Sequence, residues 1–74
     1  MEKQIIQILS QLFEKEIKEG EEISVDTEEK WDSLKHIEIV MTLEEEFDIS
    51  FAPEDIPQLK SLSKIIEKVK ELKC

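Results

Sequence analysis

The sequence predicts an all-α fold: a small four-helix bundle with three longer helices, one short helix and a long loop between the first and second helices. Three stretches place apolar residues three and four positions apart, which is the spacing of a helix that buries one face. One glycine and two prolines are the only strong helix breakers in the chain. Because 74 residues support one core, we expect a single domain over residues 1–74.

The first helix is predicted from Glu2 to about Lys18. Its apolar side chains form one stripe, made of Ile5, Ile8, Leu9, Leu12, Phe13 and Ile17. Gly20 follows, and glycine often ends a helix because it adopts left-handed backbone angles without strain. We therefore expect Gly20 to mark the helix end.

The segment 19–32 has no helical period and is predicted to be a loop. Ile23 and Val25 alternate with polar neighbours, as in a short strand, but the sequence offers no second strand to pair with them. We expect these two side chains and Trp31 to anchor the loop to the core, where burial of the indole contributes several kcal/mol.

A second helix is predicted to begin at Asp32 or Ser33, since both residue types cap helix N-termini through their side-chain oxygens. It extends to about Asp48. Its apolar residues cover more than one stripe: Leu34, Ile37, Ile39, Val40, Met41, Leu43 and Phe47. A helix with so wide an apolar surface is either central in the bundle or exposes apolar side chains to a partner.

Two further helices follow a short connector. Pro53 suits the first position of a helix, and Glu54 and Asp55 suit its electropositive first turn. Pro57 ends this helix early, so it is the short one. A last helix begins at Ser61. Its apolar stripe is the most regular in the chain: Leu62, Ile65, Ile66, Val69 and Leu72.

Acidic residues dominate the charge of the chain. Nineteen Asp and Glu stand against ten Lys and Arg, a formal net charge of −9. Nucleic acid and anionic membrane surfaces are poor partners, because phosphate binding depends on Lys and Arg that release counterions. The charge favours proteins with basic patches, which electrostatic steering brings together. Alternatively, it serves only to keep a small domain soluble.

The sequence predicts a cytoplasmic protein without membrane insertion. It has no apolar run of about 18 residues, as a spanning helix requires, and its N-terminal region lacks the apolar segment of a secretory signal. The single cysteine, Cys74, forms no disulfide within the chain, which fits a reducing compartment.

Most catalytic and metal-binding patterns are missing. Gly20 is the only glycine, which excludes a glycine-rich phosphate loop and an EF-hand. One histidine and one cysteine argue against a metal site. Ser33 and His36 share a helix face, but this spacing is common by chance. We therefore expect no metal and no catalytic residue, and we expect His36 to be an ordinary exposed histidine.

The motif on which the function depends is Asp32-Ser33-Leu34 at the start of the second helix. Alone, this tripeptide is ordinary helix capping. Residues 35–47 continue it as Lys-His-Ile-Glu-Ile-Val-Met-Thr-Leu-Glu-Glu-Glu-Phe. The whole stretch resembles the acyl carrier protein family, whose pattern is Asp-Ser-Leu before a helix of the type Glu-Leu-Val-Met-x-Leu-Glu-Glu-Glu-Phe. The match has no gap, and it continues less strongly through the Pro53 turn.

The resemblance implies a carrier protein and not an enzyme. In that family the motif serine receives 4′-phosphopantetheine from coenzyme A through a phosphopantetheinyl transferase, and the thiol of this arm holds acyl groups as thioesters. By this resemblance, Ser33 is the modified residue and 4′-phosphopantetheine is the covalent cofactor. The placement is physically sound, because a helix N-terminus offers free N–H groups and a positive dipole end to the phosphodiester.

The resemblance also implies which residues the transferase and other partner enzymes recognise. These residues are Asp32, Leu34, Glu38, Met41, Glu44 and Glu45, and we expect Lys35, where this sequence departs from the family, to belong to the same surface. The acids form a surface for acyl-loading and acyl-processing enzymes with basic patches, or alternatively a solvated helix face. Leu34 and Met41 contact partners beside the arm or pack in the core. The carrier itself is expected to be a monomer.

Interior apolar side chains are the expected shelter for a bound acyl chain. The candidates are Ile37, Val40, Phe47 and Ile66. Ordinary core packing is the alternative for each of them.

Three departures from the family pattern favour a specialised carrier. Trp31 precedes the motif where carriers of general fatty-acid synthesis often have Gly, and Lys35 follows it where they often have an acid. The loop before the serine is also a few residues shorter. A reversed charge excludes a wrong partner as effectively as it attracts a right one. We therefore expect partner enzymes of fatty-acid biosynthesis or of a related specialised pathway.

Two other functions remain open. An aminoacyl, polyketide or peptidyl carrier has the same arm on Ser33 and differs in its loading enzyme. An unmodified acidic helical adaptor instead binds a basic partner through the second helix. We expect no role for Cys74 in either the carrier or the adaptor function, because the cargo thiol belongs to the arm and terminal cysteines are often incidental.

Overall fold

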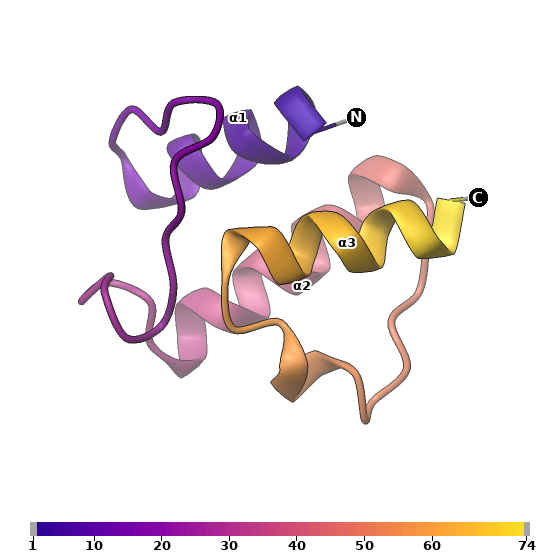
Figure 1. The fold of residues 1–74 in the computed structure, drawn as a ribbon. Helices are drawn as coiled ribbons and strands as arrows, with labels where there is room; N and C mark the ends of the chain where they lie inside the picture. Colours follow the sequence, from indigo (N-terminus) through magenta and orange to yellow (C-terminus); the bar gives the residue numbers. More distant parts are fainter. Residues whose placement is uncertain (1, 74) are drawn as a thin grey trace.

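The computed structural model describes residues 2–73, and its regular elements are all helical. In chain order they are α1 (Glu2–Phe13), α2 (Ser33–Phe47), the 3₁₀ helix η1 (Ile56–Gln58) and α3 (Leu62–Lys73) (Figure 1). The predicted all-α class is confirmed for this range. The count of four helices is not confirmed, because the expected short helix is a 3₁₀ turn of three residues.

The short element begins later than predicted, and the helix start at Pro53 is wrong. The residues after Pro53 form a turn, in which the Asp55 N–H donates to the Ala52 carbonyl at 2.9 Å. An α-helix from Pro53 would need an N–H at position 57 to bond the carbonyl of position 53, and Pro57 has none. The chain therefore forms a 3₁₀ helix that begins at Ile56.

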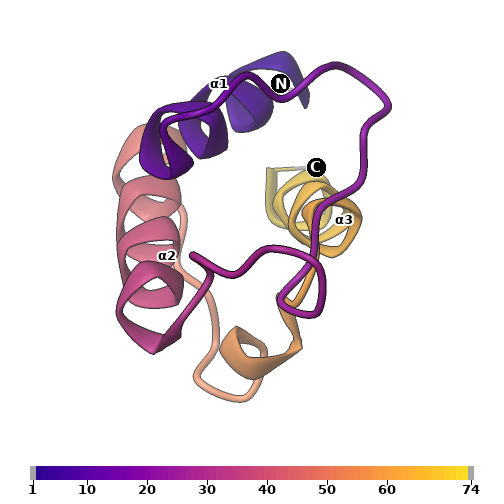
Figure 2. The same ribbon diagram turned by 90° about the vertical axis from the view of Figure 1, so that its left-hand side faces the viewer.

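The three α-helices surround one core. α1 packs against both α2 and α3, and Figure 2 shows α1 and α2 as neighbours with α3 on the other side of the core. The long loop after α1 passes alongside α3 before it returns to the start of α2 (Figure 2). This path places the loop, the start of α2 and η1 at the same end of the molecule.

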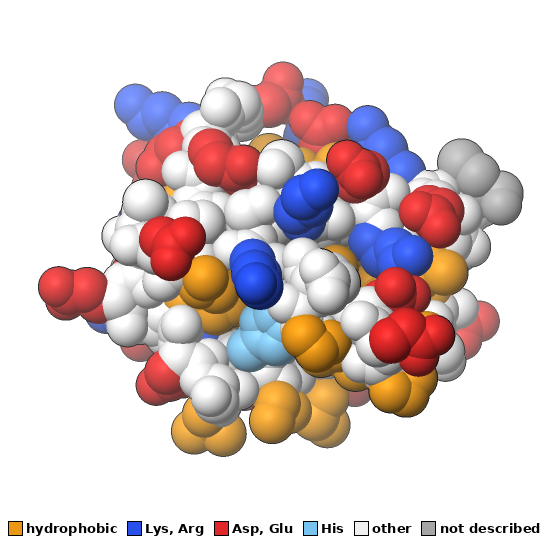
Figure 3. Space-filling model, turned by 60° about the horizontal axis from the view of Figure 1, so that its bottom comes forward, with side chains coloured by type: hydrophobic (Ala, Val, Ile, Leu, Met, Phe, Trp, Pro, Cys, Tyr) orange, Lys and Arg blue, Asp and Glu red, His pale blue; other side chains and the backbone are white. Residues whose placement is uncertain are grey.

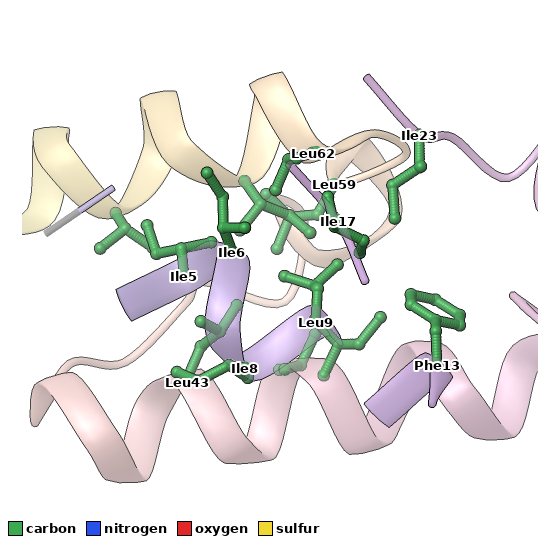
Figure 4. Close-up of a cluster of buried hydrophobic side chains, with 14 of the residues drawn as sticks. Ile5, Ile6, Ile8, Leu9, Phe13, Ile17, Ile23, Leu43, Leu59 and Leu62 are labelled. Carbon is green, nitrogen blue, oxygen red and sulfur yellow. The ribbon is translucent and has the colours of Figure 1, made fainter. Parts of the chain in front are cut away.

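The core consists of hydrophobic side chains alone among the described residues. Figure 4 shows α1 directing Ile5 and Leu9 into the space between α2 and α3. The largest fully buried side chains are Phe13, Ile5, Leu9, Ile39, Leu43, Ile65 and Val69. They come from all three helices, which confirms that each predicted stripe faces the core. The stripe of α3 ends before Leu72, which is exposed.

The first helix ends at Phe13, several residues before the predicted end near Lys18. Glu14 adopts left-handed backbone angles with φ of 53°. Its N–H donates to the Gln11 carbonyl at 3.3 Å, and the Lys15 N–H donates to the Ser10 carbonyl at 3.1 Å. This pair of hydrogen bonds is a Schellman motif, which satisfies the last carbonyls of a helix and turns the chain away.

Ser10 explains why the chain turns where it does. Its hydroxyl donates to the Ile6 carbonyl at 2.7 Å and accepts from the Ile17 N–H at 3.2 Å. Ile17 is buried as its place in the stripe predicted, but it reaches the core from the loop and not from the helix. Gly20 has a positive φ of 88°, yet it lies within the loop and does not end α1.

The loop is anchored to the core and also finds a pairing partner. Ile23 and Trp31 are buried, as predicted. Ser24 forms an antiparallel bridge with Ser61, and the Val25 N–H donates to the carbonyl of Lys60 at 2.9 Å. The strand-like alternation therefore has a partner, the segment just before α3, which has no strand pattern of its own. The predicted anchoring by Val25 is wrong, because its side chain is exposed.

Two loop glutamates hold the loop in place, Glu28 by joining its two ends and Glu22 by joining it to α3. Glu28 lies 2.7 Å from the Lys15 ammonium, which lowers the pKa of the Glu28 carboxyl, while Glu28 raises the pKa of Lys15. Glu22 accepts hydrogen bonds from the backbone N–H of Ser63 at 3.0 Å and from its hydroxyl at 2.6 Å. Glu22 thus satisfies a free N–H in the first turn of α3.

We predict that Glu14→Gly increases stability. A residue with a side chain at left-handed angles costs about 1 kcal/mol relative to glycine, and part of this gain is offset by the greater freedom of glycine in the unfolded chain. The free energy of unfolding, measured by equilibrium urea denaturation, should rise by about 0.5 kcal/mol.

Glu16→Gly is the matched control, because Glu16 is an exposed glutamate of the same loop without a positive φ. It removes the same charge, and we expect it to lower stability slightly. Equal effects of the two substitutions would contradict the assignment of the helix end to Glu14.

Candidate functional site

The start of α2 is fixed by Asp32. Its backbone is extended, its Oδ1 accepts from the Lys35 N–H at 2.8 Å, and its carbonyl accepts from the His36 N–H at 2.9 Å. Asp32 is therefore the N-cap, and Ser33 is the first residue of α2. Of the two predicted starting points, Asp32 provides the cap and Ser33 begins the helix with an exposed side chain.

The position of Ser33 suits a serine that carries an anionic group. The N–H groups of Ser33 and Leu34 lie in the first turn, where an α-helix provides no partner for them. The positive end of the helix dipole lies at the same place. Asp32 brings a negative charge nearby, but its Oδ1 is engaged by the N–H of Lys35.

Two hydrogen bonds of His36 join the loop, α2 and η1. The Trp31 Nε1–H donates to His36 Nδ1 at 3.0 Å, and His36 Nε2 lies 2.8 Å from the Ile56 carbonyl oxygen. Since Nδ1 accepts, it carries no proton, and Nε2 carries the proton and donates to Ile56. The imidazole is thus held in its neutral Nε2–H form.

The prediction that His36 is an ordinary exposed histidine is wrong. The ring is half-buried, stacks on Trp31 with 6.2 Å between ring centroids, and has both nitrogens engaged. Trp31 precedes the N-cap and His36 is the fourth helical residue. These are the two positions that pack together in a hydrophobic staple, so the spacing of the two rings was a usable signal.

An open groove of about 430 Å³ runs beside Ser33. Ser33 and Ile37 line it from α2, Trp31 and Val25 from the loop, and Ile56 from η1. Figure 3 shows a histidine on this face, bordered by hydrophobic side chains and by lysine, and His36 is the only histidine of the chain.

Lys60 also lines the groove. Lys60 and Val25 were not predicted as site residues, because it is the pairing of residues 24 and 61 that brings them to the groove. No local pattern in the sequence announces that pairing.

The apolar residues singled out on α2 divide into core and surface. Leu34 and Met41 are 71% and 62% exposed, which excludes core packing for both side chains. Val40 and Phe47 are buried in the core, and Ile66 packs against it. The interior position predicted for Ile37 is wrong, since it is 53% exposed and borders the groove.

Lys35 is held within the protein. Its ammonium donates to the Leu12 carbonyl at 3.0 Å and lies 3.0 Å from the Glu38 carboxylate. The first contact places a cation at the C-terminal end of α1, where the helix dipole favours it. The positive charge that departs from the family pattern is therefore partly neutralised by Glu38 and turned toward α1.

The predicted acidic residues of α2 differ in how free they are. Glu45 is exposed, and Glu38 is paired with Lys35. Glu44 is half-buried, and its Oε2 accepts from the Phe51 N–H at 2.8 Å, which fastens the connector after α2. Of these three carboxylates, Glu45 has the charge most available to a basic partner.

Two expectations from the sequence concern metal sites and membrane-spanning helices, and both can be compared with the structure. Within residues 2–73, no group of three or more His, Cys, Asp or Glu side chains is arranged to hold a metal ion. No helix in the same range is long and apolar enough to cross a membrane. Cys74 lies outside the described residues.

Comparison with known proteins identifies the class. The sequence model of the family described as "Phosphopantetheine attachment site" matches residues 3–69. An "Acyl carrier protein homolog" of Mycoplasma pneumoniae is 44% identical over 43 residues, which are 58% of this chain and 51% of that protein. The match thus spans about half the length of this curated relative. No solved structure matches the chain.

The chain is a phosphopantetheine-binding protein. It belongs to the acyl carrier protein family, which is a family of carriers and not of catalysts. Its cofactor is covalently attached 4′-phosphopantetheine. The residues at the start of α2 fit this group, because an exposed serine hydroxyl, free helix N–H groups and a mainly apolar groove adjoin one another there.

Asp32→Ala should lower the free energy of unfolding by about 1 kcal/mol, because the Lys35 N–H loses its capping partner. Asp32→Asn should change it far less, since asparagine caps as well as aspartate. Equilibrium urea denaturation measures both values. An equal loss in the two variants would show that the charge of Asp32, and not its cap, stabilises α2.

A second prediction concerns the tautomer of His36. Long-range ¹H–¹⁵N spectra at neutral pH should show an unprotonated Nδ1 and a protonated Nε2, because Trp31 donates to the former. Trp31→Phe removes that donor and should let the tautomer populations mix. An Nδ1–H form in the unaltered protein would contradict the hydrogen bond.

Proposed function

We propose that Ser33 is the attachment serine and that the protein carries acyl groups as thioesters on its arm. One observation carries this proposal: Ser33 is the exposed first residue of α2 and the serine of the Asp-Ser-Leu motif. The family match over residues 3–69 includes it. The groove beside it leaves room for a flexible chain to leave the hydroxyl oxygen.

The attachment reaction joins Ser33 Oγ to the phosphorus that bears pantetheine in coenzyme A. The phosphoanhydride bond of coenzyme A breaks, and adenosine 3′,5′-bisphosphate leaves. The serine proton passes to a base of the phosphopantetheinyl transferase. His36 does not serve as that base, since Trp31 and Ile56 engage both of its ring nitrogens.

The partner surface lies along the exposed side of α2. Leu34 and Met41 offer apolar contacts beside the arm, and Glu45 offers a free negative charge to basic patches of acyl-loading and acyl-processing enzymes. Asp32, Lys35, Glu38 and Glu44 belong to this surface as well. These four side chains make contacts within the chain. They therefore contribute to the partner surface through their shape and through a partly neutralised charge.

The partners belong to fatty-acid biosynthesis or to a related specialised pathway. The specialised reading is supported by the departures of Trp31 and Lys35 from the pattern of general fatty-acid carriers, and both residues make contacts inside the fold. The carrier acts as a single domain of residues 1–74, as a monomer and in the cytoplasm. Aminoacyl, polyketide and peptidyl cargo require the same arm and stay alternatives, whereas an unmodified adaptor does not use Ser33.

Mass spectrometry tests the proposal directly. The chain is incubated with coenzyme A and a broad-specificity phosphopantetheinyl transferase, and it should gain the mass of one phosphopantetheine. Ser33→Ala should abolish the gain. Ser50→Ala is the control, because Ser50 is an exposed serine outside the motif, and it should gain the full mass. Modification of Ser33→Ala, or no gain in the unaltered chain, would refute the assignment.

A further inference from the structure

The two hydrogen bonds of the His36 side chain differ in how they depend on its charge. Its Nδ1 accepts from the Trp31 Nε1–H at 3.0 Å, and its Nε2 donates to the Ile56 carbonyl oxygen at 2.8 Å. Only a neutral imidazole can do both, because it has one donor and one acceptor nitrogen. The bond to Trp31 therefore requires a neutral ring, whereas the bond to Ile56 does not.

Protonation of His36 removes the acceptor that Trp31 uses. The imidazolium has an N–H on both nitrogens, so either orientation of the ring presents a donor to the indole N–H. Trp31 is only 5% exposed, and a buried donor without a partner is unfavourable. Stacking compensates little, because the ring centroids are 6.2 Å apart, at the limit of about 6 Å for the attraction of a cation to an aromatic face. Protonation thus favours movement of the indole.

Contacts on either side of Trp31 do not involve the His36 ring. The ion pair of Glu28 with Lys15 at 2.7 Å holds the loop before it. The Asp32 carboxylate caps α2 after it through the Lys35 N–H. A movement of Trp31 is therefore confined to the few residues between Glu28 and Asp32, and α2 stays in place.

Two charged side chains line the groove together with His36: Asp32 from the start of α2 and Lys60 from the segment before α3. They oppose each other, since a carboxylate favours an imidazolium and an ammonium disfavours it. The side chains that the loop and η1 contribute to the groove are uncharged, and Lys35 and Asp55 form ion pairs elsewhere. His36 is thus the group at this contact that takes up a proton between about pH 5 and 8.

We propose that the Trp31–His36 contact is a pH-sensitive switch, which is closed while His36 is neutral and opens when His36 is protonated. Opening releases the end of the loop beside Ser33. The consequence for function rests on attachment at Ser33: Trp31 lies two residues before that serine, so its release alters the surface that a phosphopantetheinyl transferase meets. The switch itself belongs to the unmodified chain.

The coupling between two nitrogens across the hydrogen bond tests the switch in the unmodified, ¹⁵N-labelled chain. At about pH 8 we expect a coupling between Trp31 Nε1 and His36 Nδ1, together with NOE contacts from the indole to the ring of Phe13. Both should be lost at about pH 5.5. A coupling that persists at the lower pH, or an indole that keeps its contacts to Phe13 there, would overturn the proposal.

Two substitutions of His36 separate its two contacts. Asparagine offers an amide oxygen near the position of Nδ1, glutamine offers an amide nitrogen near the position of Nε2, and neither side chain titrates. His36→Asn should therefore keep the indole contacts to Phe13 at both pH values, and His36→Gln should lack them at both. A pH response of His36→Asn equal to that of the unaltered chain would assign the response to another group and refute the switch.

Asp32→Asn is the control for the neighbouring carboxylate, because it removes the charge and keeps the cap. The loss of the indole contacts at the lower pH should persist in this variant. A variant without any pH response would show that Asp32, and not His36, is the group that responds to pH.

Transferase kinetics test the consequence for the site. At neutral pH, His36→Gln should be modified with a higher KM than His36→Asn and with a similar kcat, because the loop surface differs and the serine does not. Equal KM values would refute an effect of the switch on the site. A chain that gains no mass would instead refute attachment at Ser33, while the spectra of the unmodified chain decide the switch independently.

Discussion

The hydrogen bonds of His36 are the interaction on which the site depends. Three segments that are distant in sequence meet at this ring: the end of the long loop, the first turn of α2 and η1. A neutral imidazole fits there because one nitrogen accepts from Trp31 while the other donates to Ile56. The contact holds these three segments together around the groove beside Ser33. One side chain thus links the fold to the surface around Ser33.

Much of the fold follows from local patterns in the sequence. The apolar stripes predicted three helices, and the Asp32 cap predicted the start of α2 to within one residue. The end of α1 was predicted too late because Ser10, a residue of α1, accepts a hydrogen bond from the backbone N–H of Ile17, which lies beyond the helix. The short helix was misplaced because Pro57 removes a hydrogen bond that the favourable residues at Pro53 to Asp55 cannot replace.

Only the part of the candidate site that lies on α2 could be predicted from the sequence. The motif around Ser33 and the residues Leu34 and Met41 could be proposed as site residues because they belong to one continuous stretch that resembles a known family. The groove could not, because Val25 and Lys60 are brought to it by a bridge between a loop and the segment before α3. His36 was underestimated because its two partners, Trp31 and Ile56, lie on different segments. Contacts between segments of this kind leave little trace in the spacing of residues.

The most direct test of this account is a crystal structure of the chain after loading with an acylated arm. The account predicts density continuous from Ser33 Oγ into a phosphate, with His36 still bonded to Trp31 and Ile56. Attachment at another residue would contradict it.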